Sequence, residues 1–518
     1  MQEVIQKNPL SQRVILEDQS GGRLKRACLS RGITYKGPRG PETQDNQEEY
    51  LREPRQFHWS HIGRLCPLDT SQGDDVGLTL ALTVSARIDA EGRIGARYRE
   101  VLHTEAGIRI GENDVFLHAG DKAALDGWIA FPDQRKALEN GEEVYAHCGS
   151  ERLKRVKAGD VRYIHAEDSD LFGLAANLLP YRQHNNPLRG TMACHFLRQA
   201  LPLSEKVLPR IRTPFEIGQD IAYGRELRVG YLPWYGYNFE DALVISESAA
   251  EALTSVNTWR VRFRLLRSEA DHNVSYAIRR RNDISAIPHI DPAKYDERGF
   301  IWVGKCIAAN EPLALEPPLS EMLNQDPTHR FNLHHDPKRR AGQVTGVQVI
   351  PATDPTRPAT VEFTLQETAR AELGDKLANR HGHKGVIGQI LPDGQMPYFL
   401  LDASASAESS CGCGETRPHR HLQVLINPLS VISRMNLGQL RETVEARSPE
   451  LKSLPDKVPC FEPRLNEPPR RLESEVLVGE QYVLKLDHNA AGKIHARSQE
   501  PQYYSAFEQQ PLRGQRLL

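Results

Sequence analysis

The sequence predicts a mixed α+β, β-rich fold with helical and loop insertions. Strand-like runs rich in β-branched and aromatic residues occupy 76–118 and 228–265, and the C-terminal third alternates short strand-like runs with glycine-rich loops. Between them, the apolar residues of 168–202 recur at helical spacing, which is interrupted at Pro180 and Pro187. Because 518 residues exceed what one hydrophobic core usually serves, we expect two to four domains.

The order of these runs suggests where the segments divide. The first segment, 1–80, contains a polar stretch, 21–56, with too few apolar residues to pack, which we expect to be a mobile loop. In the next segment, 81–214, strand-like runs joined across a Glu-Gly turn precede the helical spacing. Residues 266–339, with "RRR" and "PKRR" near their ends, are predicted to form a partly exposed insertion, and 501–518 a tail.

The charge balance excludes a general attraction to nucleic acid or to an anionic membrane. The 66 Lys and Arg residues nearly cancel the 68 Asp and Glu residues, which leaves a net charge of −2. Any site for a polyanion must therefore be built locally. The N-terminus lacks a basic segment followed by an apolar one, and no run of about 18 apolar residues occurs. We expect a soluble, cytoplasmic protein that does not contact a membrane.

One stretch, "GDKLANRHGHKGVIGQI", concentrates positive charge among glycines. Lys376, Arg380 and Lys384, with His381 between them, suit a phosphate-rich ligand, because Lys and Arg hold phosphates and glycine lets backbone N–H groups approach closely. The four-residue spacing would equally place the three cations on one exposed face of a helix. The glycines weaken that alternative, since each costs a helix about 1 kcal/mol.

A second candidate is the acidic pair Glu240 and Asp241, which follows an aromatic turn in "PWYGYNFEDALVIS". If the stretch is extended, one carboxylate of the pair points outward and could reach a hydrated Mg²⁺ ion. A solvated strand end is the alternative interpretation.

Seven blocks in family order resemble the β subunit of bacterial-type multisubunit RNA polymerase. They are "NPLSQ" (8–12), "FHWSHIGRLCPLDTSQGDDVGL" (57–78), "NNPLRGTMACHFLRQALPL" (185–203), "PWYGYNFEDALVISE" (233–247), "GDKLANRHGHKGVIGQI" (374–390), "INPLSVISRMNLGQLRET" (426–443) and "YVLKLDHNAAGKIHARSQ" (482–499). The series spans nearly the whole chain, so the resemblance is specific.

The resemblance implies a role for each matching residue. Lys376 and Lys384 would hold phosphates at the RNA 3′ end or at the initiating nucleotide, with His495 beside them. The remaining catalytic assignments are Arg189 and Arg434 on the incoming triphosphate, and Glu240 and Asp241 near the second catalytic Mg²⁺. Five further residues are expected to contact nucleic acid or nucleotide: Arg198, Arg380, His381, Lys493 and Arg497.

The resemblance also implies an architecture. A double-psi β-barrel is expected from 215–265 together with 340–500, and its loops would carry the catalytic groups. Residues 1–80 resemble the fork and rifampicin region, and 266–339 would be a reduced counterpart of the flap.

The family's Asp-rich metal loop belongs to the β′ subunit, and this chain contains no Asp-x-Asp-x-Asp run. The nearest approaches are "EDSD" at 167–170 and "GDD" at 73–75. We therefore expect Mg²⁺ to be held mainly by a partner and the chain to be inactive alone.

The expected partners are a β′-like subunit, a chain supplying the N-terminal β half, a DNA template, RNA and NTPs. This expectation treats the chain as part of a split or divergent polymerase, because it begins where the family's β subunit is nearly half over and stops before its final segment. Two alternatives stay open: a polymerase-binding regulatory paralogue, and a different nucleotidyl-transfer enzyme on the same barrel.

Eight cysteines are too sparse for a disulfide scaffold, and only Cys411 and Cys413 form a cluster. With His419 and His421 they offer two thiolates and two imidazoles within eleven residues, a donor set that suits structural zinc. The spacing is tighter than in the usual zinc motifs, so a loop that binds nothing is the alternative.

Overall fold

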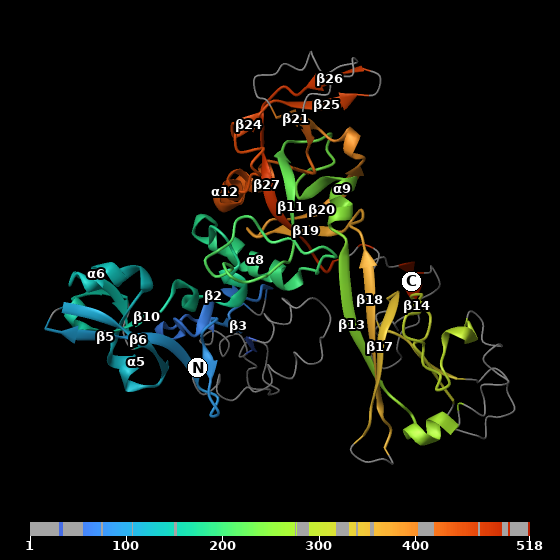
Figure 1. Ribbon diagram of the computed structural model, residues 1–518, viewed down its shortest axis with the longest axis horizontal. Helices are drawn as coiled ribbons and strands as arrows, with labels where there is room; N and C mark the ends of the chain where they lie inside the picture. The colour runs from blue at the N-terminus through green and yellow to red at the C-terminus, as the bar shows by residue number, and fades with distance from the viewer. Residues whose placement is uncertain are drawn as a thin grey trace, which may run out of the picture.

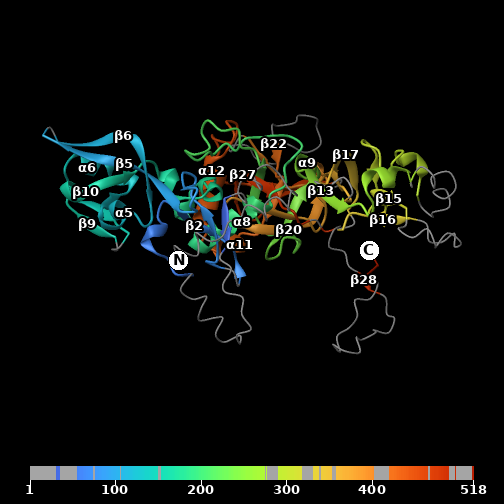
Figure 2. The ribbon, with the colours of Figure 1, turned by 90° about the horizontal axis from the view of Figure 1, so that it is seen from below.

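The computed structural model describes residues 31–34, 55–73, 76–105, 107–149, 153–274, 276, 290–317, 331–337, 340–352, 357–401, 419–464, 467–488, 490, 496–497 and 516–517. A β-barrel lies at the centre, with a β-rich lobe on one side and a long β-extension on the other (Figures 1 and 2). Within the described part, no helix combines the length and the apolar composition needed to span a membrane.

Six strands close the central barrel. They are β11 (Arg225–Tyr231), β23 (Val424–Ile426), β12 (Ala242–Ser246), β20 (Lys384–Leu391), β19 (Lys376–Asn379) and β27 (Val476–Lys485), in this spatial order, and β27 pairs back onto β11. The short strand β24 (Lys457–Val458) adds to β27. Buried aliphatic side chains such as Val229, Ile245 and Leu377 fill the interior, because inward and outward positions alternate along each strand. The predicted β-rich fold with a barrel core is confirmed.

The N-terminal lobe is a seven-stranded sheet with two short helices, α5 (Lys122–Asp126) and α6 (Arg135–Glu139). Its strands are β4 (Arg87–Ile88), β5 (Ile94–Thr104), β6 (Gly107–His118), β7 (Trp128–Ala130), β8 (Val144–His147), β9 (Lys154–Val156) and β10 (Val161–His165). The expected Glu-Gly turn lies between β4 and β5, where Gly92 adopts a φ of +80°.

A three-stranded sheet joins this lobe to the rest. It contains β1 (Gly32–Thr34), β3 (Thr79–Leu82) and β2 (Leu65–Thr70). Strand β1 falls inside 21–56, so the predicted mobile loop is wrong at these three residues. The reason is local, since Ile33 is buried against Leu65 and Leu82.

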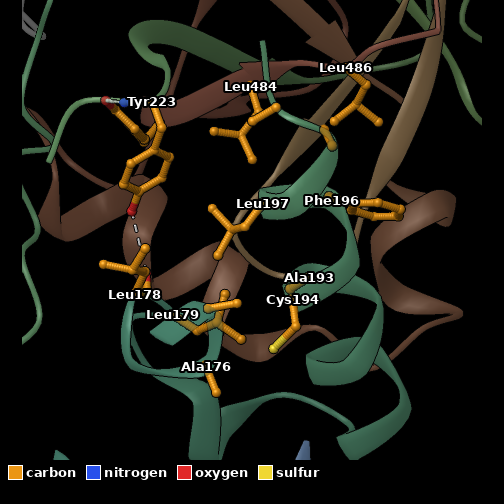
Figure 3. Packing of buried hydrophobic residues seen from close by; sticks show 14 of the residues in the cluster. Ala176, Leu178, Leu179, Ala193, Cys194, Phe196, Leu197, Tyr223, Leu484 and Leu486 are labelled. Carbon is orange, nitrogen blue, oxygen red and sulfur yellow. Dashed lines mark hydrogen bonds between the residues drawn. The ribbon is translucent and has the colours of Figure 1, made fainter. Parts of the chain in front are cut away.

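The predicted helical segment docks on the barrel. It contains α7 (Leu174–Asn177) and α8 (Pro187–Gln199), and Pro187 begins α8 rather than breaking it, because Asn186 caps the helix by accepting from the Leu188 N–H at 3.0 Å. One face of α8, including Phe196 and Leu197, packs near Leu484 of β27 (Figure 3). This packing fixes α8 beside β19 and β20.

The extension has its own core. Strands β13 (Ser255–Arg264) and β18 (Thr360–Ala369) leave the barrel as an antiparallel pair, joined by β17 (Gly342–Ile350) and β14 (Cys306–Ile307). The hairpin β15 (Ala314–Glu316) and β16 (Asn332–His334) packs nearby. Trp259, Phe300 and Phe363 are buried in one cluster. The described part of the predicted insertion is therefore packed against its flanking strands.

The remaining elements lie around the barrel. They are α9 (Glu247–Ala252), α11 (Leu429–Ile432), α12 (Leu437–Glu445), β21 (Tyr398–Leu400), β22 (His419–His421), β25 (Cys460–Arg464), β26 (Glu467–Arg471), β28 (Ala496–Arg497) and β29 (Arg516–Leu517). Single 3-10 turns occur at Trp59–His61, Pro132–Gln134, Ala158–Asp160, Asp168–Leu171, Arg182–His184, Pro292–Lys294 and Asp393–Gln395.

Candidate functional site

The lysine-rich stretch is a β-hairpin, which excludes the exposed-helix alternative. Lys376 begins β19 and Lys384 begins β20. Lys376 pairs with Val386, and Lys384 pairs with Ala378, so the two lysines are diagonal neighbours on the same face of the hairpin. Lys384 is exposed and Lys376 is half-buried. One anion can therefore meet both ammonium groups.

The turn of this hairpin is held by a buried carboxylate. Arg380 and His381 are fully buried, and both donate to Glu442 of α12, Arg380 through Nη2 to Oε1 at 2.6 Å and His381 through Nε2 to Oε2. Burial alone would raise the pKa of Glu442, but the charges of Arg380 and His381 outweigh it and lower the pKa to about 2. The predicted contact of Arg380 and His381 with nucleic acid gains no support, because their side chains are enclosed and paired.

Two glycines let this hairpin approach neighbouring segments. Gly382 has a φ of +75°, and a Cβ there would lie 2.2 Å from the Arg189 carbonyl oxygen. A Cβ on Gly385 would lie 2.5 Å from the Asp241 carbonyl oxygen. The sequence suggested glycines for close approach to phosphate. At these two positions they instead allow the hairpin to contact α8 and the acidic loop, which is residues 232–241 between β11 and β12.

Asp241 and Arg434 form a bidentate ion pair. Nη2 of Arg434 donates to Oδ2 of Asp241 at 2.8 Å, Nη1 donates to Oδ1, and Nη1 also donates to the Ser430 carbonyl at 3.2 Å. Arg189 is close to this pair: burial and the Arg434 charge lower the pKa of Arg189, while Asp241 opposes them. The two predicted triphosphate ligands thus flank one carboxylate, and Glu240 beside it is exposed.

A buried histidine lies close to the same charges. His383 is 3% exposed, and burial followed by the Arg434 charge lowers its pKa to about 4. Its imidazole is therefore neutral near pH 7 and leaves the local positive charge to the arginines.

Backbone strain concentrates beside these groups. Among the described non-glycine residues, four adopt positive φ: Tyr181, Tyr235, Glu240 and Met435. Tyr235 and Glu240 lie in the acidic loop, and Met435 directly follows Arg434. Tyr181 donates through its hydroxyl to Glu445 of α12. Such conformations cost about 1–3 kcal/mol each and persist where the surroundings fix them, which is typical of functional sites.

The neighbourhood of Lys384 includes α8. The Nζ atom of Lys384 lies 5.7 Å from the centre of the Phe196 ring, which belongs to α8. Arg198, also on α8, pairs with the buried Asp69 at 2.8 Å, and its side chain is only 15% exposed. Burial raises the pKa of Asp69, and the Arg198 charge opposes this. Arg198 therefore neutralises a buried carboxylate, and its predicted nucleic-acid contact stays a prediction.

Several predicted residues cannot be placed at this site. His495, Lys493, Cys411 and Cys413 lie outside the described residues, and of Arg497 only the backbone in β28 is described.

The two histidines of the expected zinc set are described. His419 and His421 stand two residues apart in β22, with ring centres 5.2 Å apart and both near Tyr398. Across the described ranges, no group of three His, Cys, Asp or Glu residues could hold a metal ion. The zinc site stays a prediction.

Sequence reasoning missed the residues that brace the site. Glu442 and Gln439 lie on the buried face of α12. Asn185 joins His381 to this helix: its Nδ2 lies 3.0 Å from Nδ1 of His381, and its Oδ1 accepts from the Gly438 N–H at 3.1 Å. The signal available in the sequence was the spacing of Gln439 and Glu442. A helix places residues three positions apart on one face, and polar residues on a buried face need polar partners.

Comparisons with known proteins find similarity to one family over this part of the chain. A model described as RNA polymerase Rpb2, domain 6, matches residues 175–405, and one described as RNA polymerase Rpb2, domain 3, matches residues 39–88. The first range contains α8, the acidic loop and the lysine hairpin.

Curated relatives agree with these matches. DNA-directed RNA polymerase subunit beta of Pelargonium hortorum is 25% identical over 89% of this chain and 52% of its own length. The subunit of Clostridium novyi (strain NT) is 26% identical over 89% and 45%, and that of Borreliella afzelii (strain PKo) is 26% identical over 89% and 48%. The chain spans about half the length of the curated relatives it matches. Over 89% of its length the chain is similar to these β subunits of DNA-directed RNA polymerase.

Proposed function

We propose that this chain is a partial β-like subunit of a split or divergent DNA-directed RNA polymerase and supplies phosphate-binding and NTP-binding residues to an active site shared with a β′-like chain. The observation that supports this proposal is that three segments distant in sequence meet beside the turn of the lysine hairpin: Arg189 from α8, Asp241 before β12, and Arg434 after α11. Convergent cations of this kind suit phosphoryl groups.

Each group has a distinct task in this proposal. Lys376 and Lys384, on one face of the hairpin, hold phosphates of the RNA 3′ end or the initiating nucleotide, and Arg189 and Arg434 hold the incoming triphosphate. Arginine suits the second task because its planar fork binds phosphate oxygens in pairs. His383, neutral and enclosed, supports these groups without adding charge.

The carboxylates of this chain fit only a contributory role toward Mg²⁺. Glu240 is exposed, both oxygens of Asp241 accept from Arg434, and the described ranges contain no three-ligand cluster. Metal ions, when bound, would neutralise charge on the transferring phosphoryl group, and the β′-like partner would hold them. This division of ligands makes the chain inactive alone.

An exposed apolar patch beside Arg434 supports a protein partner at this face. Leu429, Ile432, Met435 and Leu437 are each 62–70% exposed. Contiguous apolar side chains of this size commonly mark protein interfaces. A covering partner would also exclude water from the ion pair next to the patch.

The test is isolation of the complex followed by reconstitution. Affinity purification of the tagged chain from its native host should recover a β′-like chain and a chain with the remaining β regions, and the assembly should incorporate NTPs on a DNA template. Recovery of an intact host polymerase would instead favour a regulatory paralogue. Recovery of no large partner, with nucleotidyl transfer by the chain itself, would favour a different enzyme on the same barrel.

A further inference from the structure

We propose that Asp241 is an internal competitor for the anion that Arg434 binds, so that a triphosphate gains Arg434 only when this carboxylate is displaced or neutralised. The inference rests on the proposed function and concerns the selectivity of the same site. The contact that carries it joins both guanidinium nitrogens of Arg434 to both carboxylate oxygens of Asp241.

The ion pair occupies the edge of Arg434 that a phosphate would use. A guanidinium offers its paired N–H groups to carboxylate and phosphate in the same geometry, so the two anions are alternatives. The side chain of Arg434 is 22% exposed and that of Asp241 is 40% exposed, which leaves the pair within reach of a ligand from solution. A triphosphate can therefore compete with Asp241 directly.

Further hydrogen bonds hold both Asp241 and Arg434 in place. The Asp241 carbonyl accepts from the Val386 N–H at 3.0 Å, and Gly385 packs closely against the same carbonyl. On the other side, Arg434 donates to the Ser430 carbonyl. The strained residues Glu240 and Met435 adjoin the two partners, which indicates that their surroundings fix both loops. The pair thus joins the loop before β12 to the segment after α11, and both sides are fixed by further hydrogen bonds.

Arg189 differs from Arg434 in its partners. It donates to the Gly382 carbonyl at 3.3 Å, and within the described residues it makes no ion pair. An arriving anion therefore meets Arg189 first and reaches Arg434 only against Asp241. A ligand that carries its own cation neutralises Asp241 as it binds, so the site favours cation-complexed triphosphate over the free anion.

The test measures anion binding by the full chain. Inorganic tripolyphosphate is titrated calorimetrically at low salt in the presence of a chelator. Asp241→Asn keeps the shape of the side chain but removes its charge, and it should bind the probe about tenfold more tightly than wild type, since charge-assisted bidentate pairs are among the stronger polar contacts. Glu247→Gln, an equal charge change at an exposed residue of α9 outside the proposed site, should alter the affinity by less than about threefold, because an exposed charge is screened.

A double variant shows whether the tighter binding of tripolyphosphate by Asp241→Asn depends on Arg434. In Asp241→Asn with Arg434→Ala, the gain should disappear. An Asp241→Asn affinity no higher than that of Glu247→Gln, a gain in affinity that persists without Arg434, or no detectable binding by Asp241→Asn would each overturn the proposal. If Asp241→Asn loses the native circular dichroism spectrum, Asp241→Ser takes its place under the same criteria. Because no partner is used, this result is independent of the polymerase assembly test.

Discussion

Substituting Gly382 by alanine should separate the lysine hairpin from α8. Gly382 has a φ of +75°, where an L-residue loses about 1–2 kcal/mol. The new Cβ would lie 2.2 Å from the carbonyl oxygen of Arg189 and 2.9 Å from its carbonyl carbon, which are backbone atoms and cannot rotate away. Restoring ordinary contact requires a displacement of about 1 Å. Strain and displacement together should lower the free energy of unfolding by about 2–4 kcal/mol.

The same displacement should impair catalysis. Arg189 would lose its 3.3 Å bond to the Gly382 carbonyl and move relative to Arg434. A 1 Å misplacement of a positioned group can cost about 100-fold in rate. Urea unfolding of the full chain measures the stability, and NTP incorporation by the assembled enzyme measures the rate.

The matched control is Gly394→Ala. Gly394 is exposed, and a Cβ there meets nothing within 4 Å, so stability should change by less than about 0.5 kcal/mol. If Gly382→Ala unfolds at the same urea concentration as Gly394→Ala and keeps the wild-type incorporation rate, the contact between the hairpin turn and α8 does not position Arg189.

Three further outcomes are expected. Glu442→Gln removes the closer of the two carboxylates that pair with the buried Arg380, the other being Glu216 at 3.7 Å, and should destabilise the chain by about 3 kcal/mol in urea titrations. Glu445→Gln, at an exposed pair, should cost about 1 kcal/mol or less, and equal effects would contradict the buried network. Stability should fall on acidification in two windows. The pKa of His147 is about 4 when folded and 6.5 when unfolded, and that of Glu442 is about 2 when folded and 4.5 when unfolded. In both cases the unfolded chain binds the proton first, so stability decreases from pH 6.5 to 4 and again from 4.5 to 2, and a pH-independent urea midpoint across either window would contradict that assignment. Zinc should be present at about one equivalent in protein purified without chelator and should be lost in His419→Ala and in His421→Ala. Less than about a tenth of an equivalent in the wild type would contradict the zinc site and favour a loop that binds no metal.

The sequence predicted elements whose causes are local. The Glu-Gly turn before β5 and the strand-rich runs follow from turn chemistry and strand patterning, which act over a few residues. The barrel was expected only from the resemblance to the polymerase β subunit. Pro187 was misjudged because proline both breaks a helix and begins one, and only the Asn186 cap distinguishes the two.

Features that depend on distant partners could not be predicted. Arg380 and His381 lie in a charged stretch typical of an exposed surface, but their counter-charge, Glu442, is some sixty residues away and buries both. The same holds for the pair of Asp241 and Arg434, where each residue was assigned to a ligand and the contact between them was not anticipated. A charge run becomes a buried network only where another element supplies the opposite charge.

The central claim is that Lys376 and Lys384 serve chemistry that needs a β′-like partner. The direct measurement is template-directed incorporation of NTPs by the assembled complex and by the purified chain. We predict incorporation only in the complex. Lys376→Ala and Lys384→Ala should each lower the rate at least about 100-fold with unchanged unfolding in urea, because neither side chain is fully buried and we propose that both bind phosphate. Incorporation by the chain alone, or wild-type rates in both variants, would contradict the account.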